Sequence, residues 1–393
     1  MMRTWAANLV QSPVYRRRVL RVAGATLAVT VAMCGGMQYL WRDAAGDSAT
    51  VTAKAKQATK TAKSSKTSQD SSAAEAQAKP TPTETALDGI GQIDGSAQVS
   101  TVGFTLDTDT QVQLEDELNT FAAYGYGVSF VLVDMTSGKT LASYADAARY
   151  SASAIKGPYV LSLAETGTID LTAAYEAATD DDATTQYLID QTITVSNNDT
   201  YKELHDTYGT DAFATWAKSA GVSVDVTQGS YLNMSAADLA RMWAKGYGYL
   251  FGSADTGSAD TGSAGSDGAD SADGDASAGT STAGSGSAGT SADNTTQTAS
   301  DLDSAARQWL AGEYSDTLNS TIHMALGGQY SVYTKAGWIN GEGDYYALND
   351  AGIVRSSSGD YVLAVMTSAA DEYELVSGLV SMLDTIHSAS MTA

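Results

Sequence analysis

Apolar residues recur along the chain with two different spacings, which predict strands at both ends of the folded part and helices between them. Alternating or continuous β-branched and aromatic runs predict five strands. These strands cover residues 127–133, 140–144, 329–335, 345–354 and 361–367. Leu114, Leu118 and Phe121 recur at helical spacing before the first strand, and an apolar helical stripe covers residues 372–386. This order predicts one antiparallel sheet assembled from both ends of the chain, with a helical lobe from the middle.

The N-terminal segment has the pattern of a membrane anchor. An almost uncharged stretch, residues 22–41, is long enough to cross ~30 Å of hydrocarbon as a helix. It follows four closely spaced arginines, Arg16, Arg17, Arg18 and Arg21. Positive residues favour the cytoplasmic side, so we expect residues 1–21 in the cytoplasm and a single-pass protein of the cell membrane with its folded part outside. The alternatives are a cleaved signal peptide and a lipoprotein signal ending at Cys34.

Two segments have low-complexity compositions that cannot form a packed core. Residues 42–101 consist mainly of small and polar residues, and we expect them to be a disordered linker. Residues 252–300 are rich in Gly, Ser, Ala, Thr and Asp, which predicts a disordered insert in a surface loop. The predicted catalytic domain therefore covers residues 102–388 and is interrupted by this insert.

Charge and composition exclude several classes of function. The formal net charge of −24 argues against a nucleic-acid partner, because a phosphate-binding surface needs clustered Lys and Arg. Cys34 is the only cysteine, so an intramolecular disulfide and a cysteine zinc site are both excluded. The three histidines form no H-E-x-x-H motif and accompany no G-x-S-x-G motif, which argues against metal catalysis and against a Ser-His-Asp triad. We expect no metal and no cofactor.

A serine and a lysine three residues apart form the first chemical motif, Ser153-Ala154-Ile155-Lys156. A serine hydroxyl needs a nearby base before it attacks, and positions i and i+3 share one face of a helix. Burial of Lys156 would lower its pKa toward neutrality, which would make its amine a suitable base. Pro158 is tolerated only in a first helical turn, so Ser153 is expected at or just before the start of a helix.

Two further motifs follow in the chain. Ser196-Asn197-Asn198 lies about forty residues after Ser153, and Lys335-Ala336-Gly337 ends an apolar strand just before Trp338. Taken singly, the first of these is typical of a turn rich in Asn, and the second is typical of a strand end. Their order after the serine and lysine motif is the more informative observation.

The three motifs together resemble the active-site motifs of class A β-lactamases and penicillin-binding proteins. The resemblance implies an α/β (α+β) fold of the β-lactamase/transpeptidase type, with a five-stranded antiparallel sheet, flanking helices and a helical lobe. It implies Ser153 as the nucleophile, Lys156 as its base and Ser196 as the proton donor to the leaving nitrogen. It also implies a substrate-binding set that comprises Asn198, Lys335, Ala336, Gly337 and Trp338.

Two departures from the class A pattern affect the expected activity. No glutamate occurs between Leu204 and Met234, where class A β-lactamases carry the residue that activates the deacylating water, and Gly229 stands at the corresponding place. Ala336 also replaces the usual Thr or Ser of the third motif. We expect a serine hydrolase that acts on β-lactams or D-Ala-D-Ala-like amides and deacylates poorly. The alternatives are a D,D-carboxypeptidase or penicillin-binding protein that binds the peptidoglycan stem peptide, and a non-catalytic wall-binding domain.

Overall fold

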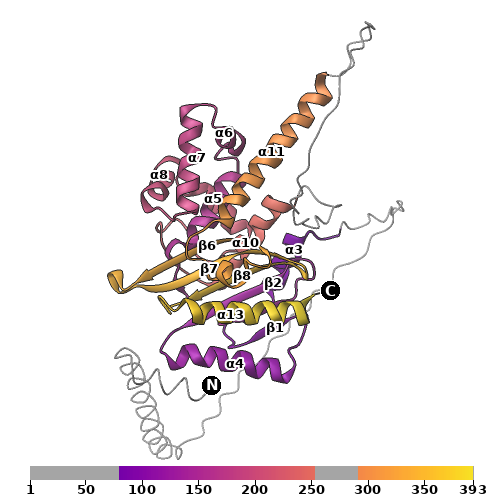
Figure 1. Ribbon diagram of the computed structural model, residues 1–393, viewed down its shortest axis with the longest axis vertical. Coiled ribbons are helices and arrows are strands. Elements are labelled where there is room, and N and C mark those ends of the chain that lie inside the picture. Colours follow the sequence, from indigo (N-terminus) through magenta and orange to yellow (C-terminus); the bar gives the residue numbers. More distant parts are fainter. Residues whose placement is uncertain (1–78, 253–290, 393) are drawn as a thin grey trace, which may run out of the picture. The chain divides into compact units, whose positions relative to one another are not determined.

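The computed structural model describes residues 79–252 and 291–392 (Figure 1). The predicted cytoplasmic segment, the predicted membrane anchor and most of the predicted linker and insert therefore lie outside the described residues. Within the described ranges, no helix combines the length and the apolar character needed to cross a membrane.

Six antiparallel strands form the central sheet, in the order β1-β3-β2-β8-β7-β6. They are β1 (Ser100–Val102), β2 (Val128–Asp134), β3 (Thr140–Ser143), β6 (Ser331–Asn340), β7 (Tyr346–Ser356) and β8 (Gly359–Thr367). The predicted assembly from both ends of the chain is confirmed, because β2 pairs with β8 along its whole length. The expectation of five strands is wrong, since β1 adds a sixth strand at the edge beside β3.

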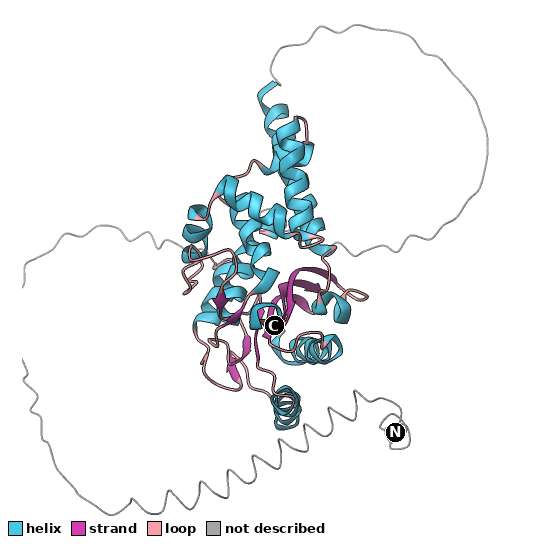
Figure 2. Ribbon diagram, turned by 90° about the vertical axis from the view of Figure 1, so that its left-hand side faces the viewer, coloured by secondary structure: helices cyan, strands magenta, loops and turns pink. Residues whose placement is uncertain are grey.

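Alternate residues of the strands face two separate apolar cores. In β2, Val131 and Val133 belong to one core, and Phe130 and Leu132 belong to the other, as the two-residue period of a strand requires. The second core is closed by α4 (Thr108–Ala123), α12 (Thr321–Leu326) and α13 (Tyr373–Ile386). The first core is closed by α3 (Pro82–Gly91), α10 (Ala236–Phe251) and the helical lobe, so the sheet lies between two helical layers (Figures 1 and 2).

The helices of that first layer come mainly from the middle of the chain, as the sequence predicts. They are α3 (Pro82–Gly91), α5 (Lys156–Glu165), α6 (Leu171–Glu176), α7 (Asp180–Ile193), α8 (Asn198–Tyr208), α9 (Asp211–Ser219), α10 (Ala236–Phe251) and α11 (Ser291–Ser315). A short second sheet pairs β4 (Arg149–Tyr150) with β5 (Asn233–Met234) at the base of this lobe.

The two segments that the sequence predicts to be disordered are too long, because the end of each one forms regular secondary structure. The end of the expected linker, residues 42–101, contains α3 and most of β1, and Thr81 and Glu84 form a reciprocal capping box at the start of α3. The end of the expected insert, residues 252–300, contains the first turns of α11, which begins at Ser291. The folded unit therefore starts near Pro80.

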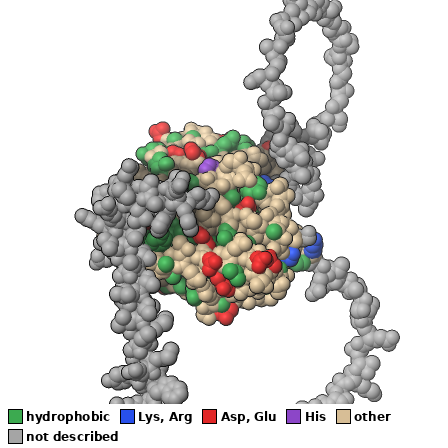
Figure 3. Space-filling model, turned by 60° about the horizontal axis from the view of Figure 1, so that its bottom comes forward, with side chains coloured by type: hydrophobic (Ala, Val, Ile, Leu, Met, Phe, Trp, Pro, Cys, Tyr) green, Lys and Arg blue, Asp and Glu red, His purple; other side chains and the backbone are tan. Residues whose placement is uncertain are grey.

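Negative charge is prominent on the surface of the folded part. On the face shown in Figure 3, Asp and Glu side chains lie in several groups, whereas Lys and Arg side chains are confined to one edge. Two lysines, Lys156 and Lys335, are instead completely buried. Buried lysines are rare unless they are paired, so these two mark a candidate functional site.

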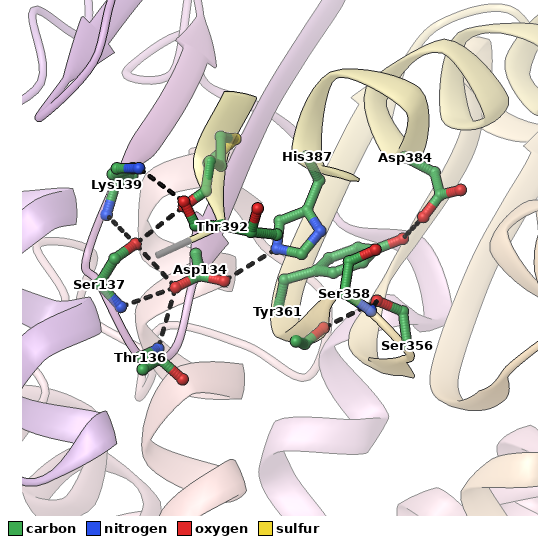
Figure 4. Close-up of polar contacts among 12 residues, drawn as sticks. Asp134, Thr136, Ser137, Lys139, Ser356, Ser358, Tyr361, Asp384, His387 and Thr392 are labelled. Atoms are coloured by element: carbon green, nitrogen blue, oxygen red, sulfur yellow. Dashed lines mark hydrogen bonds and ion pairs between the residues drawn. The ribbon is translucent and has the colours of Figure 1, made fainter. Parts of the chain in front are cut away.

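A buried contact between a histidine and a carboxylate connects the C-terminal segment to the turn between β2 and β3 (Figure 4). His387 Nε2 lies 2.9 Å from Asp134 Oδ2, and both side chains are buried. Asp134 Oδ1 also accepts hydrogen bonds from the backbone N–H and the hydroxyl of Ser137, and that hydroxyl contacts the Met391 carbonyl. Burial raises the pKa of Asp134, but the hydrogen bonds from His387 and Ser137 outweigh it, so the pKa is lowered overall.

Replacing Asp134 by alanine is therefore expected to lower the free energy of unfolding by about 3 kcal/mol at pH 7, because His387 and Ser137 lose a buried partner. The folded-state pKa lies below the ordinary value of 3.8, so this stabilisation is present above pH 3.8 and is lost as the pH falls through the lower folded-state value. Urea unfolding at pH 7 and at pH 3 measures both effects. Asp116→Ala, on the exposed face of α4, is the control, and equal stability of the two variants at pH 7 would contradict the expectation.

Candidate active site

Ser153 lies in a short 3-10 turn, η1 (Ala152–Ile155), that leads directly into α5. This is the position that the sequence predicts, with Pro158 in the first turn of the helix. Ala152 has φ +45°, a left-handed conformation that is costly for any residue other than glycine and is often stored at functional sites. Ser153 is partly exposed, and within residues 79–252 and 291–392 its hydroxyl makes no hydrogen bond. The hydroxyl is therefore accessible to a substrate.

Contacts from two remote segments hold the backbone just before Ser153. Asn349, on β7, donates from Nδ2 to the carbonyl oxygens of Tyr150 (2.8 Å) and Ser151 (3.0 Å). The Ser151 N–H donates to the Leu232 carbonyl at 2.7 Å, and the Leu232 N–H donates back to Ser151 Oγ at 3.2 Å. The strained turn is therefore fixed from the sheet on one side and from the loop before β5 on the other.

Lys156 points into the lobe and contacts the second motif. Its Nζ donates to the Ser196 carbonyl at 2.6 Å and to Asn198 Oδ1 at 2.7 Å, and it lies 3.5 Å from Ser196 Oγ. The rings of Tyr201 and Tyr231 lie 5.4 and 5.8 Å from the same nitrogen. In the part of the chain that the structure describes, no hydrogen bond joins Lys156 to Ser153, although the two residues are one helical turn apart.

Lys335 reaches the same serine from the sheet. Its Nζ donates to Ser196 Oγ at 2.9 Å and to the carbonyl oxygen of Ala336 at 2.8 Å. Ser196 has φ +61°, so the turn that presents its hydroxyl between the two amines is itself strained. The structure thus brings Lys156, Lys335 and Ser196 together from three separate segments.

Both amines are poised to exchange protons near neutral pH. Burial lowers the pKa of Lys156 from 10.5 to about 7. Burial also lowers the pKa of Lys335 to about 7, the charge of Lys156 lowers it further, and the carboxylate of Asp350 opposes these effects. Because two ammonium groups so close to each other repel, one of them is expected to be neutral at pH 7.

The remaining residues of the third motif differ in their accessibility. Gly337 faces η1, and a Cβ atom on it would lie 2.3 Å from the backbone nitrogen of Ala154. Trp338 is partly exposed, and its ring lies 5.6 Å from Lys335 Nζ. Ala336 is fully buried opposite Asp350 of β7, so its side chain does not reach the surface. The place of Ala336 in the substrate-binding set stays a prediction.

Three residues that the motifs do not include complete the site. Asn349 fixes the turn before Ser153, and Tyr231 donates its hydroxyl to Asn198 Oδ1 at 2.8 Å. Asp350 is fully buried beside the third motif, and burial raises its pKa to about 6 against the hydrogen bonds from Ser320 and Ile322. None of the three belongs to one of the sequence motifs, so the motif pattern gives no indication of their part in the site.

The surroundings of Lys156 differ from those of Lys335, which lies near the carboxylate of Asp350. Among the residues that the structure describes, no carboxylate contacts Lys156, and no group of three His, Cys, Asp or Glu side chains could hold a metal ion. Gly229 lies in the loop two residues before Tyr231. The site therefore supplies a serine and two amines but no acidic group beside Lys156.

A separate hollow of about 530 Å³ borders the turn that leads to Ser196. Its lining comprises Asp190, Thr194, Val195, Trp309, Gly312, Glu313, Asp316 and Leu318. None of these is a predicted site residue, so we assign no part of the reaction to this hollow.

A family model described as the β-lactamase enzyme family matches residues 113–255. Among solved structures, the chain is similar to a mutant class A β-lactamase of the last common ancestor of Gram-negative bacteria, with 14% identity over 71% of this chain and 99% of that chain and a TM-score of 0.46. It is also similar to a β-lactamase from Sphaerobacter thermophilus (14% identity, 72% of this chain, 98% of that chain, TM-score 0.45) and to PBP-A (16%, 71%, 95%, 0.44). No curated protein matches the sequence. The match of the family model includes the first two motifs, so over residues 113–255 this chain is similar to the superfamily of β-lactamases and penicillin-binding serine hydrolases.

Proposed function

We propose that the chain is a serine hydrolase in which Ser153 is acylated by β-lactams or by D-Ala-D-Ala-like amides. One observation carries the proposal: two fully buried lysines, Lys156 and Lys335, meet at the hydroxyl of Ser196, and Lys156 lies one helical turn after the partly exposed Ser153. Burial of two amines costs free energy, and proton transfer is the chemistry that such lowered pKa values serve best.

In the proposed reaction, Ser153 Oγ forms a bond to the carbonyl carbon while its proton passes to the neutral Lys156 amine. The backbone N–H groups of Ser153 and Trp338 would stabilise the oxyanion. The bond from carbon to nitrogen then breaks, and Ser196 delivers a proton to the leaving nitrogen and regains one from a neighbouring ammonium. Lys335 would attract the substrate carboxylate, and Asn198 would bind the acyl side chain.

Slow deacylation is part of the proposal. Hydrolysis of an acyl-enzyme needs a base that activates water, and the groups around Lys156 are a hydroxyl, amides and phenol rings. This observation favours a second candidate, a cell-wall D,D-carboxypeptidase or penicillin-binding protein, in which a β-lactam forms a long-lived adduct. A domain that binds the wall peptide without reacting is the third candidate.

The proposed location is the outer face of the cell membrane, with residues 22–41 as the anchor. The apolar stretch and the arginines before it support this location. Extraction of membranes with alkaline carbonate tests it, since an anchored chain stays in the pellet and a chain cleaved after the apolar stretch does not.

Mass spectrometry after incubation with penicillin G tests the activity. The expected result is an adduct on Ser153 that increases the mass by one intact penicillin and is absent from Ser153→Ala. An adduct that persists for hours supports the slow-deacylating enzyme, whereas fast turnover of a chromogenic cephalosporin would contradict slow deacylation. An unmodified wild-type protein would contradict acyl transfer and leave the non-catalytic domain.

A further inference from the structure

Two hydrogen-bond donors contact the oxygen of the Asn198 side-chain amide. Its Oδ1 accepts a hydrogen bond from Lys156 Nζ at 2.7 Å and another from the Tyr231 hydroxyl at 2.8 Å. Asn198 is exposed, and within the described ranges its Nδ2 makes no hydrogen bond. An amide has one acceptor oxygen and one donor NH₂ group, so saturation of the oxygen leaves two N–H donors for a ligand.

The Tyr231 hydroxyl is suited to this task because its ring is fixed by its neighbours. The ring centroid lies 5.6 Å from that of Tyr201 and 6.4 Å from that of Tyr150. Tyr201 also donates its hydroxyl to the Ser230 carbonyl at 3.0 Å, which ties down the backbone just before Tyr231. Burial raises the pKa of Tyr231 to about 12, so the phenol keeps its proton and acts as a donor at neutral pH.

We propose that Tyr231 is a positioning residue that fixes the Asn198 amide with its NH₂ group toward the substrate, and so selects acyl donors whose side chain carries a carbonyl oxygen next to the reacting ring. The inference rests on the proposed function, because it concerns how the same site recognises its acyl donor. A carbonyl oxygen can accept from Asn198 Nδ2, whereas a free amine in its place has no carbonyl oxygen to offer.

The hydroxyl and the ring of Tyr231 make different contacts, so an orienting role of the hydroxyl can be distinguished from packing of the ring. If Tyr231 only filled space, the ring would carry the effect and the hydroxyl would not matter. If the hydroxyl orients Asn198, its removal should weaken recognition of a carbonyl-bearing ligand, and the loss should depend on the presence of Asn198.

The experiment compares Tyr231→Phe with wild type by measuring second-order rate constants of acylation by mass spectrometry. Two probes share the same bicyclic lactam: penicillin G has a side-chain amide carbonyl, and 6-aminopenicillanic acid has an amine instead. For Tyr231→Phe we expect a loss of about two- to tenfold with penicillin G, the effect of one lost hydrogen bond, and no change with 6-aminopenicillanic acid. In an Asn198→Ala background the same replacement should have no effect on either probe.

Tyr208→Phe is the matched control, because it removes a phenol hydroxyl from the same lobe that lies beside Thr185 instead of Asn198. An equal loss with both probes, or no loss with either, would overturn the role of Tyr231 and leave acyl transfer intact. A loss that persists in the Asn198→Ala background would also overturn it. If the wild-type protein is not acylated by either probe, the proposed function itself fails and the inference fails with it, which is a different result from the first two.

Discussion

Methionine in place of Lys156 is expected to slow the acylation of Ser153 by penicillin G on the order of 10²- to 10⁴-fold, the usual contribution of a positioned base. Methionine has a similar length and an apolar terminus, so it fits a position that is 0% exposed without leaving a large cavity. The nucleophile, the Ser196 hydroxyl and Lys335 all remain. The rate of adduct formation, followed by mass spectrometry, measures the effect.

The control for this variant is Lys202→Met, because Lys202 is also on the helical lobe but its side chain is 73% exposed and pairs with Asp206. We expect it to acylate at the wild-type rate. A Lys156→Met protein that forms the adduct as fast as wild type would show that another group removes the Ser153 proton.

The pH dependence follows from the same burial. Lys156 acts as a base only when it is neutral, so acylation by the wild-type protein should rise through pH 7 and then level off. Between pH 7 and 10.5 the unfolded chain keeps a proton on this lysine that the folded chain has lost, so the free energy of unfolding should increase with pH in this window. Lys156→Met should remove part of that increase and be more stable than wild type near pH 6, as measured by urea unfolding.

The sheet was predictable because its strands carry strong local patterns. The runs in β2 and β8 are buried on both faces and are nearly continuous apolar stretches. β1 has no such pattern, since it is three residues long and only half-buried, and its pairing with β3 decides that it is a strand. α3 was predictable in principle, because Thr81-Pro82-Thr83-Glu84 is a capping box with proline in the first turn, but the polar residues around it hid this signal.

The sequence predicts only those residues of the site that belong to the three motifs. Ser153, Lys156 and Lys335 belong to motifs with fixed spacing, and the structure brings both lysines to Ser196. The clamp by Asn349 and the contact of Tyr231 with Asn198 join residues that are far apart in the chain, so no periodicity within one segment indicates them. The burial of Ala336 depends in the same way on its position opposite β7.

Alanine in place of Gly337 is expected to have the second large effect, through the backbone of the nucleophile. A Cβ atom at this position would lie 2.3 Å from the Ala154 nitrogen, 2.6 Å from the Ser151 oxygen and 2.7 Å from the Ser153 nitrogen. All three are backbone atoms in or beside η1, so no flexible side chain can move aside to make room. Either β6 or the turn that carries Ser153 must shift.

We expect this shift to lower the free energy of unfolding by about 1–3 kcal/mol and to slow acylation about 10²-fold, because displacing a reacting group by ~1 Å has effects of that size. The matched control is Gly312→Ala in α11, where an added Cβ meets nothing within 4 Å and the helix should gain about 0.5–1 kcal/mol. Adduct formation and urea unfolding measure both variants. Wild-type acylation by Gly337→Ala would mean that η1 and β6 are not in close contact when Ser153 reacts, since a rigid contact at these distances cannot accommodate one more carbon atom.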